Sequence, residues 1–185
     1  MELPPPPLDY EKRVPRCEEA TNLVQVGVSV LGRELLLAPD VAENWQVLCS
    51  EGARAGVRLI LISGFRSVER QTEIVKKKLE AGQTLEAILR LNAYPGFSEH
   101  HSGRAVDVGS PDCTHLTEAF ENTREFAWLN TYGARFGFFL SYPRNHPSGI
   151  QYEPWHWLNR VAVSAEPLAS ARRSHGAARA EKITE

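Results

Sequence analysis

One stretch decides the fold of this chain and points to its chemistry: Ser98-Glu99-His100-His101-Ser102-Gly103-Arg104-Ala105-Val106-Asp107. His100 and Asp107 are seven residues apart, which is not the spacing of one helical face. We therefore expect a loop to deliver His100 and a short strand to deliver Asp107. Gly103 lies between them, where a chain that turns tightly can use a residue without a Cβ atom. Imidazole nitrogen and carboxylate oxygen are both zinc donors, so the stretch predicts part of a metal site.

A second cluster follows about fifty residues later, in Glu153-Pro154-Trp155-His156. On a regular strand Glu153 and His156 would point to opposite faces. Pro154 cannot continue a ladder and bends the chain, so both side chains can face one cleft. Three protein ligands, His100, Asp107 and His156, leave a fourth zinc position open for water, which is typical of a catalytic site. An aromatic core with an incidental histidine is the alternative for this cluster.

Composition is that of an ordinary globular domain, with 42% hydrophobic and 24% charged residues in 185. The net charge of −2 gives no indication of a nucleic-acid partner. No apolar stretch is long enough for a membrane span. The run Lys76 to Lys78 is interpreted as the solvated face of a helix. The cysteines Cys17, Cys49 and Cys113 are widely separated and form no metal-binding or redox pair.

The chain divides into three parts by composition. Residues 1–16 form a proline-rich arm, in which Pro4 to Pro7 favour an extended lead. Residues 17–161 form the working domain, and residues 162–185 form a polar tail. The N-terminus lacks a basic region followed by an apolar run, so it is not a signal peptide. We expect a monomer that is cytoplasmic as written; a mature exported form cut from a longer precursor fits the sequence as well.

Hydrophobic periodicity and capping residues predict helices in three places before the metal stretch and one after it. The first runs from Pro39 to about Ala55, where Gly56 ends it. Ser67 caps the second, which ends near Gly82. The others are a short helix capped by Thr84 and one that starts at Thr117 or Thr123 and ends before Gly137.

Four short strands are predicted: Val57–Ile62, Ala105–Val108, Phe138–Ser141 and Ile150–Tyr152. The last two are expected to be joined by a loop over residues 143–149. Helices packed on a small, mostly antiparallel sheet with a zinc cleft make the expected fold class α+β.

The motifs resemble those of the VanY-type D-alanyl-D-alanine carboxypeptidases, in the wider group of lysostaphin-like peptidases and the Hedgehog signalling domain. That family's first motif, Ser-x-His-x-x-Gly-x-Ala-x-Asp, is matched at every specified position by residues 98–107. Its second, Glu-x-x-His in an aromatic stretch, is matched by residues 153–157. The turn over residues 63–67, Ser-Gly-Phe-Arg-Ser, is similar to the family's substrate-binding turn.

The resemblance implies that residues 17–161 form a zinc peptidase domain. It implies one zinc ion held by His100, Asp107 and His156, with Glu153 as general base. Arg66 would bind a substrate carboxylate or the developing oxyanion. Further contacts with the peptidoglycan peptide would come from three residues, namely Gln71, Ser98 and Trp155.

Several alternatives remain open at this point. His101, next to His100, is an alternative ligand. Cys113 near His115 could form a thiol–base pair, although no third group to orient them is evident. The same fold could also serve an L,D-carboxypeptidase or an endolysin-type peptidoglycan peptidase. A zinc-stabilised binding module without turnover is the alternative from a different class.

Overall fold

The computed structural model describes residues 2–29 and 32–160. At its centre is a four-stranded antiparallel sheet with the strand order β3-β4-β6-β5. The strands are β3 (Ile60–Ser63), β4 (Ala105–Gly109), β5 (Phe138–Leu140) and β6 (His156–Asn159). Helices and small antiparallel sheets together confirm the predicted α+β class.

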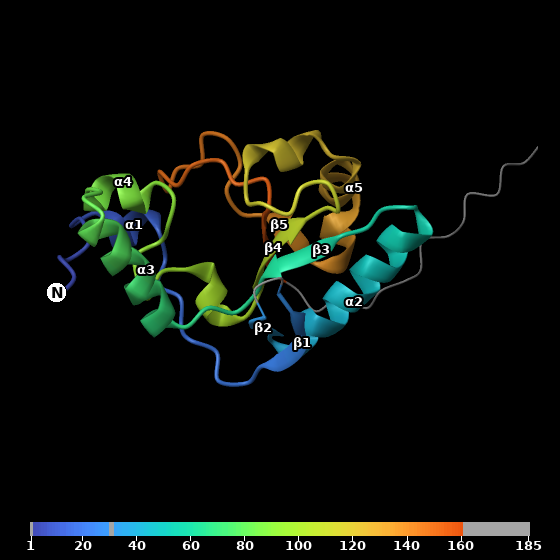
Figure 1. The fold of residues 1–185 in the computed structure, drawn as a ribbon, viewed down its shortest axis with the longest axis horizontal. Helices are drawn as coiled ribbons and strands as arrows, with labels where there is room; N and C mark the ends of the chain where they lie inside the picture. Colours follow the sequence, from blue (N-terminus) through green and yellow to red (C-terminus); the bar gives the residue numbers. More distant parts are fainter. Residues whose placement is uncertain (1, 30–31, 161–185) are drawn as a thin grey trace, which may run out of the picture.

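Helices cover two regions around this sheet (Figure 1). Near one end lie α2 (Pro39–Arg54) and α5 (Arg124–Tyr132); towards the other lie α1 (Tyr10–Arg13), α3 (Val68–Glu80) and α4 (Leu85–Leu89). The described residues also contain three short 3-10 helices: η1 (Glu99–Ser102), η2 (Glu118–Asn122) and η3 (Gly133–Phe136).

Predicted helix boundaries agree with the structure because local capping determines them. The Ser67 and Thr84 side chains accept hydrogen bonds from the backbone N–H of Arg70 and Ala87, at 3.0 and 3.2 Å. Thr123, one of the two predicted starts, caps α5. Gly56 follows α2 with φ +74°, a left-handed conformation that ends a helix at little cost for glycine.

Two strand predictions need correction. Residues 150–152 form no strand, because their backbone bonds to loops instead: Gln151 N–H donates to Arg90 O at 2.8 Å. Ile150 is buried in a side cluster rather than paired in the sheet. The strand predicted over Val57–Ile62 is β3, which begins at Ile60 instead of Val57. The strand that lies between β4 and β5 in the sheet is β6, which starts at the predicted ligand His156.

A two-stranded hairpin, β1 (Val24–Val28) with β2 (Glu34–Leu37), was not predicted. Its burial pattern is irregular and its register shifts between Gln25 and Gly27, so no clean period of two marks it in the sequence. The hairpin matters for the site because Leu36 O, in β2, accepts a hydrogen bond from Phe65 N–H at 2.8 Å. This bond holds the turn that follows β3.

The main core lies between α2, α5 and the sheet, and includes Trp45, Val106, Phe138 and Trp157. A smaller cluster around Phe97 incorporates the N-terminal arm, whose residues 2–7 have no regular structure. Tyr10 of α1 is only 2% exposed, and its hydroxyl accepts a hydrogen bond from Tyr94 N–H at 3.0 Å. The arm therefore packs on the domain.

The proposed boundary at residue 16 stays a prediction, and the predicted tail, 162–185, lies outside the described residues. Within residues 2–29 and 32–160, no helix has both the length and the apolar character needed to cross a membrane.

Candidate metal centre and active-site cleft

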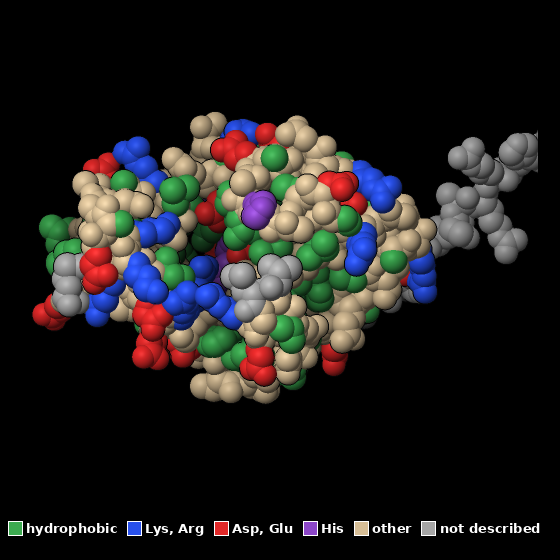
Figure 2. Space-filling model, in the orientation of Figure 1, with side chains coloured by type: hydrophobic (Ala, Val, Ile, Leu, Met, Phe, Trp, Pro, Cys, Tyr) green, Lys and Arg blue, Asp and Glu red, His purple; other side chains and the backbone are tan. Residues whose placement is uncertain are grey.

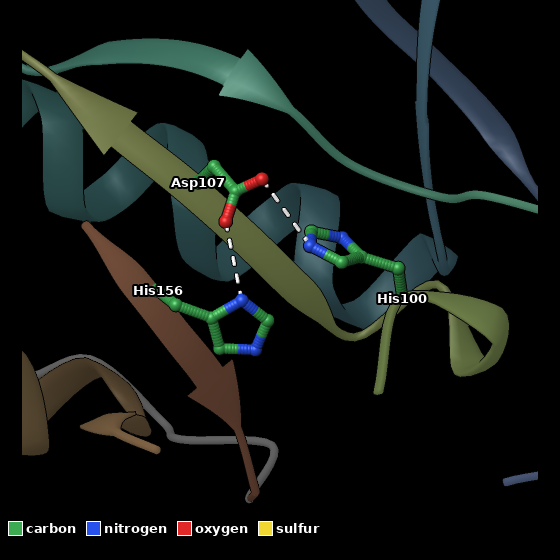
Figure 3. Close-up of side chains that lie close together, drawn as sticks. All are labelled: His100, Asp107 and His156. Atoms are coloured by element: carbon green, nitrogen blue, oxygen red, sulfur yellow. Dashed lines mark hydrogen bonds and ion pairs between the residues drawn. The ribbon is translucent and has the colours of Figure 1, made fainter. Parts of the chain in front are cut away.

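Three predicted ligands meet at one place. The donor atoms of His100, Asp107 and His156 all lie within 4.8 Å of one another, and all three side chains are buried. Asp107 lies between the two imidazoles (Figure 3): its carboxylate oxygens are 3.2 Å from His100 Nε2 and 3.1 Å from His156 Nδ1. The three residues that the two motifs supply therefore come together in the folded chain, as the sequence predicted.

Sheet register explains why Asp107 and His156 meet. They are directly opposite each other in the antiparallel pair β4–β6. Residues opposite each other in such a pair extend from the same face, with Cβ atoms about 4.5–5.5 Å apart. Ser63, the last residue of β3, is the partner of Asp107 on the other side. Asp107 is therefore fixed in the middle of the sheet, with little freedom to move away.

His100 reaches the same point by a different route. It lies in η1, which ends at Gly103 with φ +66°. A Cβ atom at Gly103 would lie 2.7 Å from the Leu23 side chain and 3.1 Å from Ala38 N, so only glycine fits there. The chain can then turn directly into β4 and bring His100 back over Asp107.

The His100 ring is oriented from behind. Its Nδ1 lies 2.6 Å from the carbonyl oxygen of Gly64, which can only accept a hydrogen bond. Nδ1 therefore carries the proton, and the lone pair of Nε2 faces Asp107. Burial lowers the pKa of His100 more than the Asp107 charge raises it, which favours the neutral form that binds metals.

His156 is oriented by a carboxylate that we did not predict. Its Nε2 lies 2.9 Å from Glu99 Oε2, while its Nδ1 faces Asp107. Burial alone would lower the pKa of His156, but the hydrogen bonds to Asp107 and Glu99 raise it to about 10. With Nε2–H donated to Glu99, the second proton on Nδ1 occupies the position where a cation would lie.

The donor set fits a zinc ion. Two imidazole nitrogens and one carboxylate oxygen converge, each imidazole has a hydrogen-bond partner on its other nitrogen, and this arrangement is usual for metal-ligating histidines. Hydrogen bonds and charge interactions with His100 and His156 lower the pKa of Asp107 below its usual range, although burial opposes this. A carboxylate that stays ionised while buried is suited to a cationic ligand.

Glu153 lies beside the three donors without joining them. The backbone N–H of His156 donates to Glu153 O at 3.1 Å, which makes a tight turn through Pro154 and Trp155. The turn places Glu153 Oε2 3.7 Å from His156 Nδ1, so both side chains face one cleft as predicted. Burial raises the pKa of Glu153 to about 7, a suitable value for proton transfer near neutral pH.

Arg66 enters the same cleft from the turn after β3. Its backbone is fixed at both ends, because Arg66 N–H donates to His100 O at 3.1 Å and Arg66 O accepts from His101 Nδ1 at 2.6 Å. Its guanidinium Nε is buried and has no hydrogen-bond partner among the described residues. Burial lowers the pKa of Arg66, while Asp107 and Glu153 act against this.

These groups share a cavity of about 250 Å³. Figure 2 shows histidine and acidic side chains inside a hollow, with Lys and Arg side chains gathered along one side. The cavity is lined by Arg66, Lys78, Leu91, Asn92, Ala93, Ser98, His100, Asp107, Leu116, Tyr142, Ile150, Glu153, Trp155 and His156. Ser98 and Trp155 belong to this lining, and their contact with substrate stays a prediction.

Gln71, the third predicted contact, is not in the lining. It is 1% exposed, and its amide Nε2 donates to Ala93 O at 2.6 Å. Gln71 therefore supports the backbone of a lining residue, and its contact with substrate stays a prediction.

His101 is placed away from the three donors. Its Nδ1 donates to Arg66 O and its Nε2 accepts from Gly96 N–H at 3.1 Å, so both ring nitrogens are used within the protein. The alternative that His101 is the ligand is therefore not supported. Cys113 Sγ contacts the backbone carbonyl oxygen of His115 at 3.7 Å, and this contact is not a thiol–base arrangement.

Three residues of the site were missed from the sequence. Glu99 could have been suspected from its place next to a ligand in the first motif. Tyr142, whose ring packs on His156 with centroids 4.9 Å apart, carries no local signal. Lys78 was interpreted as part of a solvated helix face, since a cavity cannot be seen in the sequence.

An α+β domain with a buried His–Asp–His cluster in a cleft defines a protein able to hold one metal ion. The model of the VanY D-alanyl-D-alanine carboxypeptidase family matches residues 34–160, and the chain belongs to this family. The match includes all three donors, Glu153 and Arg66.

Relatives and solved structures agree with the family. A D-alanyl-D-alanine carboxypeptidase of Enterococcus faecium is 31% identical over 133 residues, 70% of this chain and 39% of that protein. The LdcB LD-carboxypeptidase structure has a TM-score of 0.69 at 28% identity and covers 76% of this chain and 69% of its own. A VanY D,D-pentapeptidase mutant in complex with Zn(II) has a TM-score of 0.59 at 28% identity, with 76% and 79% covered. The chain spans about two fifths of the length of the first curated relatives.

Proposed function

We propose that this protein is a zinc-dependent D,D-carboxypeptidase that removes the terminal D-Ala from peptidoglycan stem peptides or their precursors. The observation that carries the proposal is the convergence of His100, Asp107 and His156 beside Glu153 in one cleft. A site that only stabilised the fold would need no buried carboxylate with a pKa near 7 next to the ligands.

His100 Nε2, one Asp107 oxygen and His156 Nδ1 would hold the zinc ion. A zinc ion with a free position supplies an acidified water and polarises a carbonyl group. Glu99 keeps the lone pair of His156 Nδ1 directed to the site by accepting the proton on Nε2. Gly64 O does the same for His100.

Glu153 accepts the proton of the attacking water and then delivers a proton to the leaving amine. Arg66 supplies a fixed positive charge for the substrate carboxylate or the oxyanion. Two observations support this role: His101 holds the backbone carbonyl of Arg66 next to the site, and Arg66 Nε is buried with no hydrogen-bond partner among the described residues. Ser98 and Trp155, which belong to the cavity lining, would contact the peptide.

The proposal is tested with defined stem peptides and mass spectrometry. We expect a pentapeptide ending in D-Ala-D-Ala to lose one alanine, a chelator to stop the reaction, and zinc to restore it. The same peptide with an amidated C-terminus should be a poor substrate, since Arg66 would lack its carboxylate. Equal cleavage of both forms would indicate an endopeptidase of the endolysin type.

A second candidate is an L,D-carboxypeptidase, which is favoured by the similarity to the LdcB structure. The two activities differ in the residue before the scissile bond. Release of D-Ala from a tetrapeptide, with the pentapeptide left intact, would identify the L,D activity. Zinc binding without hydrolysis of either peptide would support the alternative that the protein is a zinc-stabilised binding module without turnover.

The cleft is complete within one chain, which supports action as a monomer. Residues 17–161 remain our proposed extent of the peptidase domain.

A further inference from the structure

Lys78 is a cavity residue to which the proposed mechanism gives no role. It belongs to α3 and lines the same cavity as the three donors and Glu153. Its neighbour Lys77 is exposed and outside the lining, whereas Lys78 is partly buried. The two lysines, adjacent in sequence, are therefore on different sides of the helix, and only one of them faces the cleft.

The Lys78 ammonium has no hydrogen bond or ion pair within the part of the chain that the structure describes. Other cations of this region do have partners: Arg70, on the same helix, is 2.6 Å from Glu73. Burial and the nearby charge of Arg66 lower the pKa of Lys78, and Glu153 acts against this; all three effects support a position inside the cleft rather than in open solvent. An unpaired cation in a partly desolvated cavity attracts an anion more strongly than one in water.

The position of Lys78 along α3 indicates where this anion would lie. Arg66 precedes the first helical residue, Val68, by two positions, and Lys78 is ten residues further along, roughly 15 Å of helix axis. Helical side chains lean towards the N-terminus, so the ammonium extends back in the direction of Arg66. The distance between the charged groups of Arg66 and Lys78 is therefore shorter than this length of helix. Such a distance corresponds to about two or three residues of an extended peptide, at roughly 3.3 Å each.

We propose that Lys78 binds a side-chain carboxylate on the residue that precedes the terminal D-Ala-D-Ala pair. Arg66 would bind the terminal carboxylate and Lys78 the second one. The preferred substrates are then acidic peptides that carry two carboxylates a few residues apart. The inference rests on the proposed function and names the substrate class of the same site.

The test compares two peptides that differ only in charge, acetyl-Glu-D-Ala-D-Ala and acetyl-Gln-D-Ala-D-Ala. With the zinc-loaded protein we expect kcat/KM to be about five-fold higher for the Glu peptide, an effect of the size found for partly exposed ion pairs. Lys78→Met should bring this ratio close to one. Lys77→Met, the matched control on the outer side of the same helix, should leave it unchanged.

Charge reversal gives a sharper outcome. Lys78→Glu should prefer acetyl-Lys-D-Ala-D-Ala over the Glu peptide, the opposite of the wild-type order. A ratio that persists in Lys78→Met, or an equal loss with Lys77→Met, would overturn the inference.

Binding keeps the two proposals separate. Calorimetry with zinc-loaded Glu153→Gln measures Kd for the Glu and Gln peptides without turnover. If neither peptide is hydrolysed by the wild type but the Kd ratio still depends on Lys78, the proposed reaction fails and the carboxylate site stands. If both peptides are hydrolysed at equal rates and bound equally, the reaction stands and the Lys78 site is wrong.

Discussion

Asp107 shows at the scale of one residue how burial and chemistry combine. It is 3% exposed, occupies a central strand and lies between two imidazoles. A buried carboxylate without partners would be very costly, so its neighbours must supply positive charge or a metal ion. The residue types of the motifs therefore specify chemistry only because the fold removes water from around them.

Glu153→Gln should keep zinc binding and reduce kcat by about 10²–10⁴-fold, because glutamine cannot accept the proton. Hydrolysis rates and the zinc content of the purified variant would be measured together. A variant with bound zinc and near-normal kcat would remove Glu153 from the role of general base.

Glu99→Ala should weaken zinc affinity by about 10–100-fold, the usual cost of losing a partner behind a metal-ligating histidine. The physical reason is that His156 would no longer be held with Nδ1 facing Asp107. Competition with a chromogenic chelator measures this directly. Glu99→Gln is the matched control: its amide oxygen can still accept from His156 Nε2, so most of the affinity should return. Equal losses in both variants would argue against this orientation.

At the scale of elements, a few connections fix the position of the metal loop. Arg104, immediately before β4, forms a two-armed ion pair with Asp40 of α2, at 3.1 and 2.8 Å. It also donates to the carbonyl of Asn159 at the end of β6, at 2.9 Å. One side chain thus joins the helix, the central strand and the strand that carries His156.

Asp40→Asn should lower the free energy of unfolding at pH 7 by about 0.5–1 kcal/mol, since both partners are partly exposed. The hydrogen bond to Arg104, opposed by partial burial, lowers the pKa of Asp40 in the folded state. The stabilisation is therefore complete above about pH 4, the ordinary range for an unfolded aspartate, and is lost as the pH falls through the lower folded pKa. Denaturant unfolding of both proteins at pH 7 and pH 3 checks this, because the difference should be much smaller at pH 3.

Gly103→Ala should destabilise the domain by about 2 kcal/mol or more. The substitution combines a left-handed backbone with a Cβ atom 2.7 Å from the Leu23 side chain. Gly82→Ala is the control: φ is +83° there but no atom lies within 4 Å, so only the backbone cost of about 1 kcal/mol is expected. Thermal unfolding of the two variants separates the steric clash at Gly103 from backbone strain. Equal losses of stability in both variants would contradict the steric clash with Leu23.

At the scale of the whole molecule, the site joins segments that are far apart in the chain. The turn after β3, η1 and the start of β6 all border the cavity. The smaller cluster contains Tyr10 of the N-terminal arm and also Tyr142, whose ring packs on His156. Metal binding should therefore stabilise the fold as a unit, since the ligands converge only in the folded chain.

Zinc at 100 times its Kd should add about 2.7 kcal/mol to the free energy of unfolding. For a domain of this size, at about 2–4 °C per kcal/mol, the expected rise in Tm is about 5–11 °C, measured by calorimetry with and without chelator. Asp107→Asn should show little or no rise, whereas Glu153→Gln should show the full effect. If zinc left the Tm of the wild type unchanged, this result would contradict the proposed set of zinc ligands.

The sequence by itself determined the α+β class, the capped helices and the residue types of the metal site, because capping, helix-ending glycines and donor chemistry act over a few residues. It could not show the β1–β2 hairpin, nor that the strand after Tyr142 begins at His156 rather than Ile150. Only the tertiary structure decided the partners of the ligands, namely Glu99 and Gly64 O, and the place of Lys78 in the cavity lining. Register, ring orientation and burial depend on contacts between distant segments, and such contacts form only when the whole core is packed.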